Sequence, residues 1–302
     1  VMMRHIKTFM LPAAMLLGIL FYKEIEYVVF LSPYLIFLML FVTYCRLSIR
    51  DLKITRLHLW MLIIQVGGAL AVYSAILPFN RIIAEGAFIC IFCPTATSAP
   101  VITSMLGGSI ASVISYSILS NLAVAVLSPF VFSFVGGHTT LPFAESFLIV
   151  ARQMLPLIVA PLILAIVLKK AFPAVHKFMY DAQSISFYLW AIALILVLGK
   201  AMGFIVSNGS EKVDAEGVLS IFALIVCGLQ FYLGKRLGSH YGDRIAGGQG
   251  LGQKNTVLCI WMAFTYLSPM SSVAPASYII WQNIINSYQL IRANSTSTKC
   301  NK

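Results

Sequence analysis

The stretch GGQGLGQKNT, residues 247–256, interrupts an otherwise apolar part of the chain. Four of the six residues 247–252 are glycine, and glycine is a poor helix former, so the pattern predicts that the backbone leaves the helix here. Lys254 and Asn255 follow, and the next fifteen residues, 256–270, are mostly apolar. A lysine beside a helix break in such a sequence is the feature that a functional hypothesis must explain.

The composition predicts an integral membrane protein. Of the 302 residues, 60% are hydrophobic and only 10% are charged, and the mean hydropathy is +0.90, whereas about a quarter of the residues of a soluble domain are charged. About 20 apolar residues span the hydrocarbon core of a bilayer. Ten apolar runs approach that length, namely 8–22, 25–45, 58–79, 82–101, 110–135, 147–168, 185–198, 218–233, 257–267 and 273–291. We therefore predict an all-α, multi-pass protein of the cell (inner) membrane, with the lipid bilayer as its surroundings.

The net charge of +11 is explained by basic residues in the loops on one side of the membrane, so it does not require a nucleic-acid partner. With ten helices, 15 of the 21 Lys and Arg residues fall on loops of one side. Five others (Lys23, Arg81, Arg152, Lys200 and Lys212) fall on the opposite side, and Lys254 remains within the membrane. Because positively charged loops stay in the cytoplasm, both termini are predicted to be cytoplasmic.

A short repeat divides the chain into halves. Met-Leu-Pro occurs at 10–12 and again at 154–156, each time before an apolar run. If these tripeptides open equivalent units, each unit has five helices, and an odd number makes the two repeats inverted, as in many secondary transporters. The predicted domains are 1–137 and 138–292, and the Ser/Thr/Asn/Lys-rich residues 293–302 are predicted to be a disordered cytoplasmic tail.

The fourth helix of each predicted half is broken. The first break is CPTATSAP, residues 93–100, and the second is GGQGLGQKNT. Pro94 would interrupt a continuing helix, whereas Pro100 suits the first turn of a new one. Irregular backbone at membrane depth survives only where protein or water satisfies its polar groups, so paired breaks indicate a binding site near the midplane. The alternative is ordinary Gly/Pro kinks in a packed bundle.

These two stretches resemble motifs of the bile acid:sodium symporter family. Residues 93–103 read CPTATSAPVIT against a family pattern close to C-P-G-G-T-A-S-N-V-[IM]-T, residues 250–255 read GLGQKN against E-x-G-x-Q-N, and Gln65 matches a glutamine of the third helix. The resemblance implies ten helices that form a core domain (helices 3–5 and 8–10) and a panel domain (helices 1, 2, 6 and 7). It also implies two broken crossing helices (4 and 9) and transport by alternating access.

The chain departs from the family at the sodium ligands. The family's Ser-Asn pair aligns with Ala99 and Pro100, its Glu with Gly250 and its ligand Gln with Lys254. Ligand Ser and Thr residues on the fifth helix align with Val113 and Ser117, and Gln65 is retained. Because nearly all of the family's sodium ligands are missing, we predict a divergent member that does not bind sodium in the family manner.

The charge at the crossing suggests what replaces sodium. In the family, two sodium ions and one glutamate sum to +1, and here a protonated Lys254 contributes +1. We predict that Lys254, with Gln65, supplies the charge of the ion sites and bonds to carbonyls of the broken helices. An intramembrane charge is costly and indicates function, although a lysine near a helix end can also extend to the membrane interface. Transport would be proton-coupled if Lys254 loses and regains its proton, and facilitative if it stays charged.

The resemblance also implies the substrate-binding residues. Thr97 and Asn255 align with the family's motif Thr and Asn, and they are implied to contact a small organic anion, aided by backbone amides near Ser98 and Thr256. The alternative role of these side chains is to cap the half-helices, as Ser, Thr and Asn often do.

Other functions remain open at this stage. An arsenite- or auxin-carrier-like exporter of the same fold would use the thiol of Cys93, a thiol oxidoreductase would use Cys90 with Cys93, and a channel or sensor would have a degenerate transporter fold. We predict no enzyme activity, no cofactor and no metal site, because no catalytic motif is recognisable and the five histidines are scattered along the chain.

Overall fold

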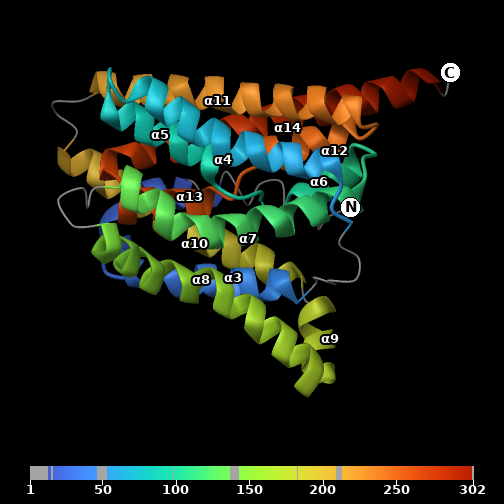
Figure 1. The fold of residues 1–302 in the computed structure, drawn as a ribbon, viewed down its shortest axis with the longest axis horizontal. Coiled ribbons are helices and arrows are strands. Elements are labelled where there is room, and N and C mark those ends of the chain that lie inside the picture. Colours follow the sequence, from blue (N-terminus) through green and yellow to red (C-terminus); the bar gives the residue numbers. More distant parts are fainter. Residues whose placement is uncertain are drawn as a thin grey trace. The chain divides into compact units, whose positions relative to one another are not determined.

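The computed structural model describes residues 13–14, 16–45, 53–96, 98–136, 143–181, 183–208 and 213–300, and most of these residues lie in helices (Figure 1). The named elements are α2 (Tyr22–Ile25), η1 (Val29–Leu31), α3 (Ser32–Tyr44), α4 (Arg56–Ile76), α5 (Arg81–Phe92), α6 (Ala99–Met105), α7 (Ile110–Val135), α8 (Phe143–Ala171), α9 (Pro173–Asp181), α10 (Gln183–Asn208), α11 (Val213–His240), α12 (Arg244–Gly252), α13 (Thr256–Tyr266), η3 (Pro269–Ser272) and α14 (Val273–Cys300). The predicted all-α class is confirmed for the described residues.

Among the described residues, three helices are long and apolar enough to cross a bilayer, namely Arg56–Ile76, Ile110–Val135 and Glu216–His240. Apolar side chains such as Trp60 and Ile63 on α4 and Leu229 on α11 are about half exposed. In water such surfaces would be costly, but lipid tails are as apolar as these side chains. The helices therefore point to a membrane protein.

The chain folds into two compact units. Unit 1 comprises residues 1–47, 125–213 and 260–272, and unit 2 comprises 48–124, 214–259 and 273–302. Each unit takes segments from both predicted repeats. The segments in unit 2 are those of the predicted core domain, except that the C-terminal parts of α7 and α13 belong to unit 1. The inverted relation of the repeats stays a prediction.

Unit 1 is built around α3 and α10, which pack against each other. Helix α10 also contacts α2, and α3 contacts α8. Glycines allow the closest approaches: a Cβ on Gly18 would overlap the carbonyl oxygen of Ile195, and a Cβ on Gly199 would overlap the side chain of Ile25. Small residues at such contacts are typical of helices packed in membranes.

Unit 2 contains the two interrupted helices. Helix α5 packs against α4 and α14, and α12 packs against α4 and α6. The first interruption begins at Cys93, after α5, and its described residues are 93–96 and 98, whereas the second covers 253–255, between α12 and α13. Pro94 lies in the first break and Pro100 in the first turn of α6, as predicted.

The position of the second break differs from the prediction. Residues 247–252 are helical and complete α12, so only Gln253, Lys254 and Asn255 leave the helix. The glycines serve close packing instead of unwinding. A Cβ on Gly247 would overlap the carbonyl oxygen of Gly234 and lie 2.9 Å from the Cα of Gly238, so α11 and α12 touch backbone to backbone.

The later glycines of α12 have the same role. A Cβ on Gly252 would overlap the ring of Phe231, and a Cβ on Gly250 would overlap Met61 and come within 2.9 Å of Tyr116. Each glycine lowers the stability of a helix by about 1 kcal/mol relative to alanine. The close contacts of the α12 glycines with α4, α7 and α11 compensate for this cost. The glycines of 247–252 therefore permit close contacts with neighbouring helices, and the prediction of an unwound backbone there was wrong.

The C-terminal end of the chain also differs from the prediction. Helix α14 continues to Cys300, whereas residues 293–302 were expected to form a disordered tail. No glycine follows Val273, and the one later proline, Pro275, lies in the first turn of α14, so nothing in the sequence stops the helix. Residues 301 and 302 lie outside the described residues.

Candidate functional site: a buried lysine at a helix crossing

The two breaks of unit 2 pair with each other. Thr95 and Lys254 form an isolated antiparallel bridge, in which the N–H of Ala96 donates to Gln253 O at 3.0 Å and the N–H of Asn255 donates to Pro94 O at 2.9 Å. We call residues 93–96 and 253–255 together the crossing. Its backbone groups bond to each other because no helix turn is available to them.

Lys254 is buried at this crossing, with a relative exposure of 1%. Its ammonium Nζ donates to the carbonyl oxygens of Ile91 at 2.8 Å and Cys93 at 3.0 Å. Its backbone N–H donates to Oε1 of Gln282 at 3.0 Å. The ammonium thus bonds to carbonyls of the first broken helix, and it does not extend to the surface of unit 2. Among the described residues the ion pair is that of Arg81 with Glu85, so carbonyl dipoles face the charge of Lys254 and no described carboxylate neutralises it.

The carbonyls at the end of α5 all accept side-chain hydrogen bonds. The last carbonyls of a helix have no partner within it and carry a partial negative charge. Besides the bonds from Lys254, Gln65 Nε2 donates to Phe92 O at 2.8 Å and to Cys93 O at 3.1 Å. Gln230 Nε2 donates to Cys90 O at 3.1 Å. The end of α5 is therefore a concentrated acceptor site, occupied by one cation and two amides.

Gln65 is the centre of this network. Its Oε1 accepts from Tyr116 Oη at 2.6 Å and from Ser120 Oγ at 2.8 Å. Ser120 Oγ also accepts from the N–H of Thr95 at 3.3 Å. All four side chains are buried, and such a network is stabilising only when every member has its partners.

Carbonyl oxygens at the end of α12 also accept hydrogen bonds from side chains. Thr95 Oγ1 donates to Gly250 O at 2.8 Å, and Tyr278 Oη donates to Gly252 O at 2.8 Å. Sequence reasoning missed the side chains that hold both helix ends, namely Tyr116, Ser120, Gln230, Tyr278 and Gln282. In the sequence, each of the five is a polar residue within an apolar helix. Such residues are too common in apolar helices for these five to be selected without coordinates.

The predicted substrate residues have different surroundings. Thr97 lies outside the described residues, and Ser98 is exposed just before α6. Asn255 and Thr256 are buried at the start of α13. Asn255 Oδ1 accepts from the N–H of Leu258 at 3.3 Å, which is the alternative, capping role.

Two polar atoms at the second break have no hydrogen-bond partner. They are Asn255 Nδ2 and Gln253 Oε1, and both residues are buried. A buried group of this kind normally has a partner. The cap therefore uses only the oxygen of Asn255, and its amide donor has no partner among the described residues.

The cysteines of this region are buried thiols. Cys90, Cys93, Cys227 and Cys259 lie in unit 2 with no measurable exposure, and these four cysteines and Cys45 are free thiols. Within the described part of the chain, no group of three or more His, Cys, Asp or Glu side chains is arranged to hold a metal ion.

Replacing Gln65 with leucine is expected to lower the free energy of unfolding by about 2–4 kcal/mol, because the carbonyl of Phe92 and the hydroxyls of Tyr116 and Ser120 would lose their partner. Unfolding in mixed micelles titrated with sodium dodecyl sulfate measures the change. Ile63→Leu, at an exposed position of the same helix, is the control and should change stability by less than about 0.5 kcal/mol. Equal stability of Gln65→Leu and the wild type would show that the network has no structural role.

Comparison with known proteins gives one informative similarity. No protein-family model matches the chain. Over 216 residues it is 24% identical to YocS of Bacillus subtilis (strain 168), described as an uncharacterized sodium-dependent transporter. The match covers 68% of this chain and 62% of the relative, less than two thirds of that protein's length. Together with the apolar helices, the similarity supports a transporter family and a location in a membrane.

Proposed function

We propose that this chain is a secondary transporter of a small organic anion, working by alternating access without sodium. The observation that carries the proposal is the position of the Lys254 ammonium, 2.8 Å from Ile91 O and 3.0 Å from Cys93 O. Carbonyls at the end of a broken helix bind cations in transporters of this kind. A lysine bonded to them is a tethered cation.

Electrostatics favours one cation at this place. Two unit charges about 4 Å apart repel by about 4 kcal/mol at an effective dielectric constant of about 20. A sodium ion that shared these carbonyls with the ammonium would face this repulsion, and Ala99, Pro100 and Gly250 offer it no side-chain oxygen. YocS is described as sodium-dependent, and we propose that this chain differs from it at this step.

The wider architecture is part of the proposal. We infer ten helices in two inverted repeats, with unit 2 as the core domain, unit 1 as the panel domain, and both termini on the cytoplasmic side of the inner membrane. These inferences are supported by the distribution of Lys and Arg along the chain and by the paired breaks. Bile acid:sodium symporters share these features, and we propose a distant membership of that family.

Sodium dependence is the direct test. We expect uptake of a transported carboxylate into proteoliposomes to proceed at the same rate when external sodium is replaced by choline. The measurement is the initial rate of uptake of a labelled carboxylate, first selected by thermal shift from acetate, pyruvate, lactate and benzoate, because a ligand of the native state raises the melting temperature. A severalfold higher rate with sodium would contradict the proposal.

Two coupling modes are compatible with a tethered cation. If Lys254 releases its proton in one state, an imposed pH gradient drives accumulation, and a proton ionophore abolishes it. If Lys254 stays charged, transport is facilitative and neither treatment changes the final level. The same proteoliposomes distinguish the two modes.

Asn255 is proposed to bind the substrate's carboxylate through Nδ2, and Gln253 Oε1 favours a substrate that also carries a donor such as a hydroxyl. Asn255→Asp keeps an oxygen to cap α13 but removes the amide donor. We expect the melting temperature to stay within a few degrees of the wild type and the rate of uptake to fall at least about tenfold, as expected for loss of a hydrogen bond to a charged group. Unchanged uptake would leave Asn255 with a capping role alone.

A further inference from the structure

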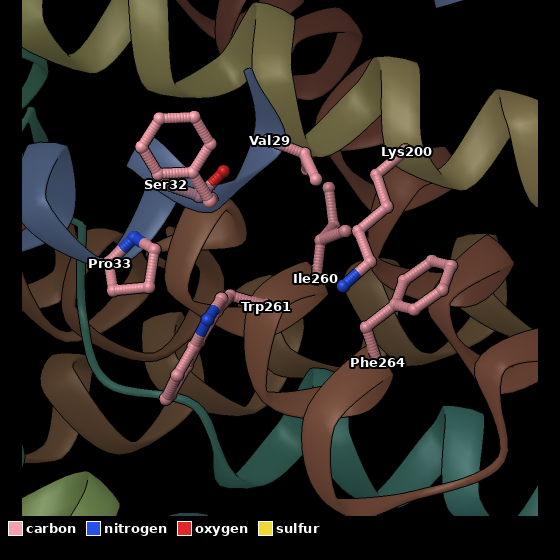
Figure 2. Close-up of a pocket in the computed structure, with 8 residues that line it drawn as sticks. Val29, Ser32, Pro33, Lys200, Ile260, Trp261 and Phe264 are labelled. Atoms are coloured by element: carbon pink, nitrogen blue, oxygen red, sulfur yellow. The ribbon is translucent and has the colours of Figure 1, made fainter. Parts of the chain in front are cut away.

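Unit 1 contains a cavity that the proposed transport site does not use. Its volume is about 150 Å³, and it is lined by Val29, Phe30, Ser32, Pro33, Lys200, Ile260, Trp261 and Phe264. Figure 2 shows Lys200 reaching from α10 toward Ile260 and Phe264, with Ser32, Pro33 and Trp261 also around the cavity. All eight residues belong to unit 1, and none belongs to the crossing.

The polar groups of this cavity are suited to an anion. Lys200 is exposed, and its Nζ lies 4.7 Å from the centre of the Phe264 ring, which is a cation–π contact. No acidic residue lines the cavity, and the ion pair found among the described residues is that of Arg81 with Glu85. The charge of Lys200 is therefore not neutralised by a described carboxylate.

A second, independent observation concerns Ser32. Its side chain lines the cavity, is 2% exposed, and its Oγ has no hydrogen-bond partner. A buried hydroxyl without a partner is costly, and a ligand oxygen in the cavity would supply the missing partner. Trp261 adds a flat apolar wall and an N–H donor.

We propose that this cavity binds an anionic group carried on a small apolar body. The ammonium and the hydroxyl would bond to the anion, and the side chains of Val29, Ile260 and Phe264 would surround the apolar part. A cavity of about 150 Å³ accommodates a six-membered ring, so a cyclic carboxylate is a suitable probe. The same chemistry also fits the acidic headgroup of a lipid, and the experiment below separates the two sources.

The first arm uses cyclohexanecarboxylate and its uncharged analogue cyclohexanecarboxamide, each titrated against the full-length protein in a neutral detergent by saturation-transfer difference NMR. We expect the carboxylate to bind and the carboxamide to bind at least about tenfold more weakly, since hydrogen bonds to charged groups are the stronger ones. Lys200→Gln is expected to weaken carboxylate binding about tenfold or more, and Ser32→Ala is expected to weaken it by a smaller factor. Lys23→Gln is the matched control, because Lys23 also lies over an aromatic ring, that of Tyr22, but does not line the cavity.

The second arm compares retention of dioleoyl phosphatidylglycerol and dioleoyl phosphatidylcholine by native mass spectrometry in the same three variants. Retention of the anionic lipid that depends on Lys200 would support the proposal with a lipid headgroup as occupant, and binding of the carboxylate alone would support a free anion. The proposal is overturned if neither ligand depends on Lys200, or if the carboxamide binds as well as the carboxylate. Because both arms measure binding and not uptake, their result is independent of whether the crossing transports an anion.

Discussion

Lys254→Met is expected to reduce transport to the background rate of empty liposomes while the protein still folds. Methionine has a similar length but no charge, so the carbonyls of Ile91 and Cys93 lose their cation. The effect on the free energy of unfolding is expected to stay below about 3 kcal/mol, because relief from burying a charge without a counter-ion opposes the loss of two hydrogen bonds. Uptake in proteoliposomes therefore reports the function of the ammonium, separately from folding.

A matched control and a second variant sharpen this test. Arg236→Gln removes a positive charge from an exposed position of unit 2 and should leave uptake unchanged. Lys254→Ala leaves space beside the same carbonyls, and we expect any residual uptake in this variant to increase with sodium. Wild-type uptake by Lys254→Met would show that the tethered cation is not required, and the proposed mechanism would then be wrong.

Gly247→Ala is expected to destabilise the protein strongly, lowering the free energy of unfolding by about 3 kcal/mol. The new methyl group would overlap the backbone of Gly234 and Gly238, and backbone atoms of a packed helix cannot move aside as a flexible side chain can. Helices α11 and α12 would have to separate next to the crossing. The yield of folded protein and the unfolding midpoint in mixed micelles measure the effect.

Gly228→Ala is the control for this substitution. Gly228 lies on α11 with open space around it, so alanine should be neutral or stabilise the protein by about 0.5–1 kcal/mol through its better helix propensity. If Gly247→Ala were as stable as Gly228→Ala, the close packing of α11 against α12 would not be needed for folding.

Part of this site could be predicted from the sequence because it depends on local chemistry. Pro94 cannot continue a helix, and Lys254 is a charge in an apolar environment, so both the first break and the unusual lysine are visible without coordinates. Resemblance to a transporter family then suggested that the lysine meets the first broken helix, and its hydrogen bonds to Ile91 O and Cys93 O agree with that suggestion. The prediction from helix propensity that residues 247–252 leave the helix was wrong, since glycine suits either an unwound backbone or a close contact between helices.

By itself, the sequence determined that the chain is a bundle of apolar helices, interrupted near Pro94 and near Lys254, because hydropathy and helix-breaking residues act over a few neighbouring positions. Only the tertiary structure decided that the glycines of α12 remain helical against α11 and that Gln65, Tyr116 and Ser120 hold the crossing together. These contacts join residues that are distant in the chain. Their strength depends on the distances between helices, which no local pattern of residues specifies.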